Sequence, residues 1–271
     1  MADFAARAMS TSELNPEGST LAEHVARSDY AARVCEAIAR ISTAPDKAAV
    51  LGLLKQLVLA LGADAGVFTS FVRDDATNSS YRSLLACDPL WGTEYARHGW
   101  FTDDPWLYHA LCSASAVRAS ELAPATPAQR TVCEAARQFG FASAVIVPAP
   151  SAAGHSRVGV LCLGSPIDNY FESDGYLLFR CLAQGLAMEL HHWWYRQIRD
   201  ELIANLRLTE DDLALLRHEQ QGHSSKVTAS ALDTLPQTID CRFQRLSAKL
   251  GMANRRAAVR YAELYGLIEL M

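Results

Sequence analysis

The sequence has no apolar run of the roughly 18 to 20 residues that a membrane-spanning helix needs. Its first residues also lack the basic segment followed by an apolar segment that marks a secretory signal. Residues 1–20 are small and polar, and we expect them to be disordered. These absences predict a cytoplasmic protein that does not act at a membrane.

Cysteine pairs with redox or metal-binding spacing are also absent. The seven cysteines are scattered, and none belongs to a C-x-x-C pair, which indicates a reducing compartment rather than a disulfide framework. In the segment HEQQGH, His218 and His223 are one residue too far apart for the zinc-protease motif. On a helix their side chains would point about 140° apart. We therefore expect no metal site.

The sequence lacks the motifs of common nucleotide-binding and hydrolytic enzymes. It contains no G-x-G-x-x-G, no P-loop and no G-x-S-x-G. Nucleophilic catalysis would also need a base placed beside the nucleophile, and no histidine is spaced for that role. The sequence therefore predicts a protein that is not an enzyme and that needs no cofactor.

Charge is distributed unevenly along the 271 residues, a length that suggests about two domains. The net charge is −5, yet Leu208–Met271 contains eight basic and eight acidic residues, so the deficit lies in residues 1–207. Within Pro236–Arg260, six Lys and Arg residues face one acid, Asp240. This local excess of positive charge is typical of a nucleic-acid-binding segment.

The C-terminal region, residues 208–271, is predicted to form four short helices. Gly222 should end the first helix, and Ser224 is a suitable N-cap for a second that runs to Leu232. Pro236 suits the first position of the next helix, because its fixed φ fits there and its missing N–H costs nothing. Two helices joined by such a short turn form a helix-turn-helix, whose second helix enters a DNA major groove.

The remaining chain predicts an α+β fold, in which an antiparallel sheet lies between helices as an α/β/α sandwich. Apolar periodicity predicts helices at Leu21–Ile41, Lys47–Leu61, Pro127–Phe139 and about Glu172–Leu206. Strands are expected at Ala65–Val72, Ser80–Cys87, Ser143–Pro148 and Arg157–Leu163, with turns at 73–79 and 149–156. We place this domain at 21–195, a linker at 196–207 and the all-α four-helix domain at 208–271.

An unusual segment, WGTEYARHGWFTDDP, begins at Trp91. Trp91 and Tyr95 are four residues apart, so their indole N–H and phenol O–H would point into the same space on a helix. Asp104 and Pro105 follow. These donors and this acceptor suit a small ligand with an amide or lactone group. Taken alone, however, such aromatic residues are more often core residues, and Asp-Pro is more often a turn.

The C-terminal pattern resembles the DNA-binding domain of LuxR-type transcription regulators. The residues that carry the resemblance are Gly222, Thr238, Lys249, Leu250, Gly251, Asn254 and Arg255. Asp212 stands where the family usually has Glu, and Arg242 stands where many members have His. Helix periodicity places Gln244 and Asp240 where they can read bases, while basic residues hold phosphates. The candidate DNA-binding residues are Lys226, Gln237, Thr238, Asp240, Cys241, Arg242, Gln244, Arg245, Lys249, Arg255 and Arg256.

The W-x-x-x-Y…D-P pattern is similar to the signal-binding domain of LuxR-type receptors for N-acyl-homoserine lactones. The resemblance implies that Trp91 contacts the lactone carbonyl, Tyr95 an acyl carbonyl and Asp104 the amide N–H, with Pro105 shaping the turn. Cys162 falls where the family often has Ser or Thr near the amide.

Three positions depart from the family at the same pocket. Ala119 lies where a second Trp is expected, Ala144 replaces a usual Gly, and Cys87 replaces a wall aromatic. We expect these changes to reshape the cavity.

The sequence therefore predicts a homodimeric transcription regulator, an activator of quorum-sensing type. It would bind double-stranded DNA at a dyad-symmetric promoter site, respond to an N-acyl-homoserine lactone or similar acylated signal, and contact RNA polymerase. Two alternatives remain open. The same architecture with an altered pocket would act without a ligand or through a protein partner. A hydrolase of acylated lactones would use Cys162 or Asp104.

Overall fold

The computed structural model of the chain describes residues 19–72, 81–151 and 157–268 and confirms the mixed α+β class predicted from the sequence. Two compact units divide between His191 and His192. This point lies inside a continuous helix, α7 (Tyr176–Asn205), which includes most of the linker expected at 196–207. The domain limits inferred from the sequence stay a prediction.

A five-stranded sheet with the order β2-β1-β5-β4-β3 forms the centre of the first unit. Its strands are β1 (Ala65–Val72), β2 (Arg82–Ala86), β3 (Val117–Arg118), β4 (Ser143–Pro150) and β5 (Arg157–Ser165). Every pair whose register is described is antiparallel; Thr69, for example, lies opposite Ser83. The two-residue β3 was not predicted, because it is too short to show a period. The turn expected at 73–79 and most of that at 149–156 lie outside the described residues.

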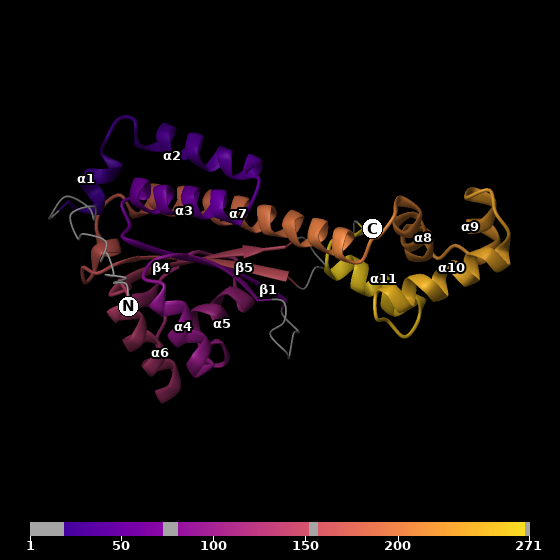
Figure 1. The fold of residues 1–271 in the computed structure, drawn as a ribbon. Coiled ribbons are helices and arrows are strands. Elements are labelled where there is room, and N and C mark those ends of the chain that lie inside the picture. Colours follow the sequence, from indigo (N-terminus) through magenta and orange to yellow (C-terminus); the bar gives the residue numbers. More distant parts are fainter. Residues whose placement is uncertain (1–18, 73–80, 152–156, 269–271) are drawn as a thin grey trace, which may run out of the picture. The chain divides into compact units, whose positions relative to one another are not determined.

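Helices cover both faces of the sheet, as the predicted sandwich requires. Figure 1 shows α2, α3 and α7 on one face and α4, α5 and α6 on the other. Their bounds are α1 (Leu21–Val25), α2 (Tyr30–Ala39), α3 (Lys47–Leu61), α4 (Leu90–His98), α5 (Pro105–Cys112) and α6 (Pro127–Gln138). Helix α3 has the predicted limits, because Asp46 accepts a hydrogen bond from Ala49 N at its start and Gly62, with φ +88°, ends it.

The single helix expected over Leu21–Ile41 is wrong. The chain forms two helices, α1 and α2, separated at residues 26–29, and α1 begins with a capping box between Thr20 and Glu23. Tyr30, at the start of α2, is buried and donates a hydrogen bond to Leu61 O (3.1 Å). This contact fixes α2 against the end of α3, which the apolar period alone does not encode.

The second unit contains the four predicted short helices after α7. They are α8 (Glu210–Gln220), α9 (Ser225–Ala231), α10 (Pro236–Lys249) and α11 (Arg255–Leu264). Gly222 and Gly251, with φ of +73° and +68°, turn the chain after α8 and α10. The buried sides of these helices share one apolar core, which includes Leu216, Phe243 and Leu246. Across both units, no described helix is long and apolar enough to cross a membrane.

His218 and His223 do not diverge as expected. The chain turns back at Gly222, His223 N donates to His218 O (3.0 Å), and the two imidazole Nδ1 atoms lie 2.8 Å apart. One ring can donate to the other, so the pair needs no ion to hold it. No group of three His, Cys, Asp or Glu side chains in the described ranges is placed to hold a metal ion.

The approach of β5 to the turn before β4 generates a stability prediction. A Cβ atom added at Gly164 would lie 2.6 Å from the carbonyl oxygen of Gly140 and would collide with the Phe141 ring. Gly164→Ala should therefore lower the free energy of unfolding by about 1–3 kcal/mol. Gly52→Ala is the matched control: it lies in α3 with nothing within 4 Å, and it should raise that free energy by about 0.5–1 kcal/mol. Urea unfolding of both variants tests this, and an unchanged midpoint for Gly164→Ala would contradict the close approach.

Candidate functional site

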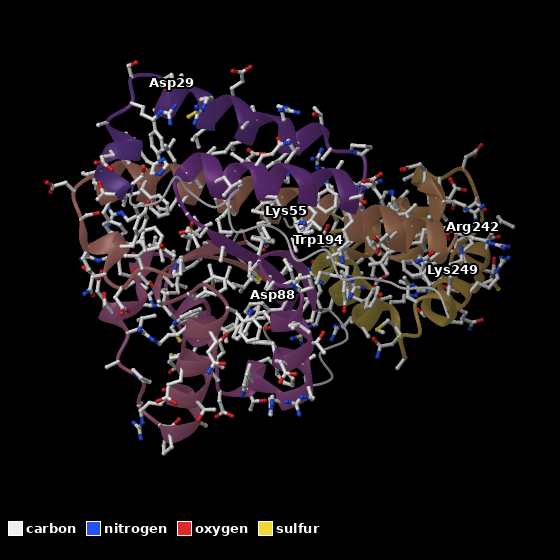
Figure 2. The ribbon with its side chains drawn as sticks, turned by 60° about the vertical axis from the view of Figure 1, so that its left-hand side comes forward. Asp29, Lys55, Asp88, Trp194, Arg242 and Lys249 are labelled. Atoms are coloured by element: carbon white, nitrogen blue, oxygen red, sulfur yellow. The ribbon has the colours of Figure 1, made fainter. Side chains whose placement is uncertain are left out.

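Helix α4 places Trp91 and Tyr95 on one side, as their spacing predicts. Asp88, which lies just before α4 (Figure 2), accepts a hydrogen bond from Leu90 N (2.9 Å) and so satisfies a donor at the start of the helix. Gly99 ends the helix with φ +64°. The Trp91 side chain is buried, and its ring centroid lies 5.4 Å from that of Tyr95.

Asp104 is the N-cap of α5, which corrects the expectation of a simple turn at Asp104-Pro105. Its Oδ1 accepts hydrogen bonds from the backbone N–H of Trp106 (2.8 Å) and Leu107 (3.4 Å). Pro105 occupies the first helical position, where its missing N–H costs nothing. The Asp-Pro pair therefore begins a helix and holds the carboxylate in one orientation.

The second oxygen of Asp104 binds to α4. Tyr95 Oη donates a hydrogen bond to Asp104 Oδ2 (2.7 Å). Asp104 is only 7 % exposed, and burial raises its pKa against the opposing effect of its hydrogen bonds with Tyr95, Trp106 and Leu107. Within the described residues no basic side chain forms an ion pair with this carboxylate. A buried carboxylate without a cationic partner favours a ligand that brings a further N–H donor.

A cavity of about 380 Å³ opens beside these groups, within the usual range for a small-molecule site. Its lining comes from β1, β2 and β5 on the sheet side and from α4 and α5 on the helix side. The lining residues are Val67, Thr69, Tyr81, Ser83, Leu85, Pro89, Trp91, Gly92, Thr93, Tyr95, Ala96, Asp104, Trp106, Leu107, Phe141, Val160 and Cys162. The cavity is thus mostly apolar, with a few polar groups that can orient a ligand.

Four of the eight predicted ligand-binding residues line this cavity: Trp91, Tyr95, Asp104 and Cys162. The other four, Cys87, Pro105, Ala119 and Ala144, are not among its lining residues. Cys87 and Ala119 are half-buried, Ala144 is buried, and all three pack with the apolar cluster around the cavity.

The aromatic walls come partly from residues that sequence reasoning missed. Trp106 and Phe141 line the cavity, with ring centroids 6.0 Å apart. Phe141 also lies 6.2 Å from Trp91, and Phe139 lies 5.4 Å from it. Trp106 lies two residues after Asp104. If a helix start had been predicted at Asp104, Trp106 would have been predicted in its first turn, close to the cavity. No local signal identifies Phe141, which precedes β4.

Three hydroxyl-bearing residues on the sheet side of the cavity were also missed: Thr69, Tyr81 and Ser83. The alternation of strand side chains contains a signal for them. Val67 and Thr69 share one face of β1, and Ser83 and Leu85 share one face of β2. Once Trp91 and Asp104 are placed over that face, these hydroxyls must face the same space.

Nucleophilic chemistry has no support in this cavity. Burial raises the pKa of the Cys162 thiol well above its ordinary value, and the Asp104 charge raises it further. No histidine is among the lining residues. The cavity can therefore bind and orient a ligand, but Cys162 lacks the base that a thiolate mechanism needs.

The residues predicted to contact DNA lie on one part of the second unit. Lys226 is on α9, and Arg255 and Arg256 begin α11. Those on α10 are Gln237, Thr238, Asp240, Cys241, Arg242, Gln244, Arg245 and Lys249. Of these, Thr238 and Arg242 are half-buried and the other six are exposed.

Several of these side chains are bound to one another. Asp240 Oδ1 accepts from Ser225 Oγ (2.7 Å) and from Arg255 Nη2, and these hydrogen bonds lower the pKa of Asp240. The Arg255 guanidinium also lies 4.4 Å above the Phe243 ring. This network joins α9, α10 and α11, so Asp240 and Arg255 hold the helices together.

Two further basic residues on α10, Arg242 and Lys249 (Figure 2), are also paired. Lys249 Nζ donates to Asp212 Oδ2 (2.8 Å) and to Arg207 O (3.1 Å), while Arg242 lies 3.5 Å from an Asp211 oxygen. Arg256 is exposed and, among the described residues, makes no ion pair. Lys226 is also exposed and makes no ion pair with another described residue.

Comparisons with known proteins agree with both units in fold. Residues 46–192 match the family described as the autoinducer binding domain. A crystal structure of Escherichia coli SdiA is 17% identical with a TM-score of 0.66, and a structure of SdiA in complex with octanoyl-rac-glycerol is 16% identical with a TM-score of 0.64. These alignments cover 89% and 90% of this chain and 100% and 99% of the SdiA chains.

A third similar structure is an N-acylhomoserine-lactone-dependent LuxR-family factor, CepR2 from Burkholderia cenocepacia. It is 18% identical, with a TM-score of 0.50, and the alignment covers 60% of this chain and 93% of CepR2. No curated protein sequence matches the chain. Because the matched residues make up more than half of its length, the chain belongs to the autoinducer-binding-domain family.

Proposed function

We propose that the protein is a cytoplasmic transcription regulator that binds an N-acyl-homoserine lactone, or a closely similar acylated signal, in the α4–α5 cavity. The observation that carries this proposal is the buried Asp104 carboxylate, which is held by Tyr95 and the α5 backbone but has no cationic partner among the described residues. An amide N–H of the signal would bind to this carboxylate. Trp91 would donate to the lactone carbonyl, and the aromatic walls would enclose the ligand.

The signal would act by completing the core around the cavity. A ligand that binds the folded first unit, and not its unfolded chain, stabilises that unit by mass action. Burial of the signal against Trp91 and Phe141 would therefore increase the folded, DNA-competent population. This coupling needs no direct contact between the signal and DNA.

The second unit would read DNA through α10, the second helix of a helix-turn-helix. Gln244 is exposed on α10 and suits adenine, through a bidentate contact with N6 and N7. The pairing of Asp240 with Arg255 argues for a positioning role for both, in place of the base and phosphate contacts expected from sequence. Arg256 and Lys226 are the better candidates for phosphate contacts, because no ion pair to another described residue occupies them.

The regulator would bind a dyad-symmetric promoter site as a homodimer. The second unit of a single chain would neutralise few phosphates, and the whole chain has a net charge of −5. A monomer would therefore bind DNA weakly at physiological salt. Two units on half-sites one helical turn apart would double those contacts. Contact with RNA polymerase would then make the regulator an activator.

A second candidate function is regulation without a signal. The hydrogen bond between Tyr95 and Asp104 favours it, because each of the two groups already has a hydrogen-bond partner within the protein. A first unit that folds on its own, with DNA binding unaffected by added lactones, would support this candidate. A titration of DNA binding with a panel of acyl-homoserine lactones separates the two functions.

Replacement of the buried carboxylate tests the signal-binding proposal. Asp104→Asn keeps an N-cap side chain but removes the charge, so the protein should fold while its affinity for the signal falls. A hydrogen bond to a charged acceptor contributes about 1.5–3 kcal/mol, which is roughly a ten- to hundredfold change in Kd. Calorimetric titration of the wild-type protein and the variant measures it. Asp103→Asn, at the exposed neighbouring carboxylate, is the matched control and should leave Kd unchanged. Equal affinity for Asp104→Asn would refute the assigned contact.

Two substitutions separate base reading from phosphate binding. Gln244→Ala should cost roughly 1–3 kcal/mol at one base position and relax specificity there. Arg256→Ala should weaken binding to all sequences alike and reduce the salt dependence by about one ion. Binding to a site library at two salt concentrations distinguishes these effects, with the exposed Gln221→Ala as control. The assignment is wrong if Arg256→Ala changes base preference and Gln244→Ala does not.

A further inference from the structure

The sheet side of the cavity carries three hydroxyl groups that no contact proposed so far uses. Thr69 on β1 lies directly opposite Ser83 on β2, and their Oγ atoms are 3.1 Å apart. Tyr81 precedes β2 by one residue, and all three side chains line the cavity. These hydroxyls form a polar wall that faces the same space as Asp104.

The Tyr81 hydroxyl is the least satisfied polar group of this wall. Its oxygen is buried, and within the described residues the one group placed to hydrogen-bond with it is the Tyr95 hydroxyl. The ring is held in place by stacking on Phe71, with centroids 5.6 Å apart and planes at 24°, and by Phe101 at 6.3 Å. A ring fixed in this way cannot turn its hydroxyl out to solvent at low cost.

Tyr81 is also the donor that remains available in the cavity's polar cluster. Tyr95 already donates its proton to Asp104, so its hydroxyl retains only acceptor capacity. Burial raises the pKa of the Tyr81 phenol well above its ordinary value, so it stays protonated at physiological pH. A ligand oxygen near the sheet would therefore compete with the Tyr95 hydroxyl for the phenolic proton of Tyr81, beside the Thr69–Ser83 pair.

We propose that Tyr81, supported by Thr69 and Ser83, forms a second polar subsite that binds an oxygen carried by the acyl chain of the signal. This inference rests on the proposed function, because it assumes that Asp104 binds the amide of the same ligand. The signal class that fits is an acyl-homoserine lactone whose chain has a hydroxyl or carbonyl oxygen close to the amide. Such an oxygen accepts from Tyr81 while the rest of the chain packs on apolar lining such as Val67, Leu85 and Val160.

The cost of an unsatisfied hydroxyl supplies the selectivity. A plain alkyl chain that sealed the cavity would exclude water and leave Tyr81 Oη with no partner except the Tyr95 hydroxyl. An oxygenated chain would satisfy it. The wild-type protein should therefore bind the oxygenated ligand at least about tenfold more tightly than the plain one.

A competing role for Tyr81 is to orient Tyr95, whose hydroxyl lies close to its own. In that role Tyr81 would act through the Tyr95–Asp104 bond and would affect every ligand equally. The ratio of two affinities therefore distinguishes a ligand contact from a positioning role, whereas a single affinity does not.

The experiment uses the full chain and two probes, N-octanoyl-homoserine lactone and N-(3-hydroxyoctanoyl)-homoserine lactone. Calorimetry gives Kd for both probes with the wild-type protein, Tyr81→Phe and the control Tyr108→Phe. Tyr108 lies on α5, but its side chain is 65 % exposed. We expect the wild-type protein and the control to prefer the hydroxylated probe at least about tenfold, and Tyr81→Phe to reduce that preference to about one.

Three results would overturn the inference. The first is that Tyr81→Phe keeps the wild-type preference, and the second is that it raises Kd for both probes by the same factor. The third is that the wild-type protein shows no preference between the probes. If Tyr81→Phe does not fold, Ser83→Ala replaces it. Loss of the Ser83 hydroxyl, which pairs with Thr69, should also reduce the preference for the hydroxylated probe severalfold. An unchanged preference in Ser83→Ala counts against the subsite.

The proposed function fails separately. If wild-type protein binds both probes and only their ratio is wrong, the subsite is refuted while the signal-binding cavity stands. If neither probe binds the wild-type protein, the proposed function is overturned and the subsite with it.

Discussion

The arrangement of the first unit around its cavity depends on the placement of one carboxylate, that of Asp104. Its Oδ1 accepts from two backbone N–H groups at the start of α5 that have no partner within the helix, and its Oδ2 accepts a hydrogen bond from the Tyr95 hydroxyl of α4. The group therefore fixes two helices at once. Its desolvation is unfavourable, and only the three hydrogen bonds oppose that cost within the described part of the chain. A ligand that adds a fourth donor would offset part of this desolvation cost.

The second unit uses the opposite electrostatic solution. Asp240 is exposed and forms an ion pair with Arg255 and a hydrogen bond with Ser225, so the same residue type stabilises a helix junction at little desolvation cost. An exposed ion pair contributes little by itself, but here it shares its cation with the Phe243 ring. The positive charge counted on α10 and the following segment is therefore partly used within the unit. The charge available to phosphates is smaller than the sequence suggests.

Sequence reasoning gave the elements well wherever a period or a cap decided them. Helix α3 and strand β1 have the predicted limits, and the four C-terminal helices follow their Gly and Pro signals. It failed where a tertiary contact decided the result. The contact of Tyr30 with Leu61 accompanies the break between α1 and α2, and it leaves no local periodic signal. The return of His223 to His218 is local instead: it follows from the predicted end of α8 at Gly222, which the expectation of diverging side chains did not take into account.

In the candidate site, too, the residues fixed by local sequence were predicted and those fixed by tertiary contacts were missed. The motif predicted Trp91, Tyr95 and Asp104, which lie together because four-residue spacing and an N-cap fix them locally. It missed the sheet side, since Thr69 and Ser83 meet only through strand pairing, and Phe141 enters from a turn distant in sequence. In the proposed function, the motif residues Trp91 and Asp104 would meet the polar head of the signal. The groups that would meet its variable chain lie on paired strands, where selection can change one face residue at a time without moving a helix. Differences in signal preference among receptors of this fold should accordingly be sought on β1 and β2.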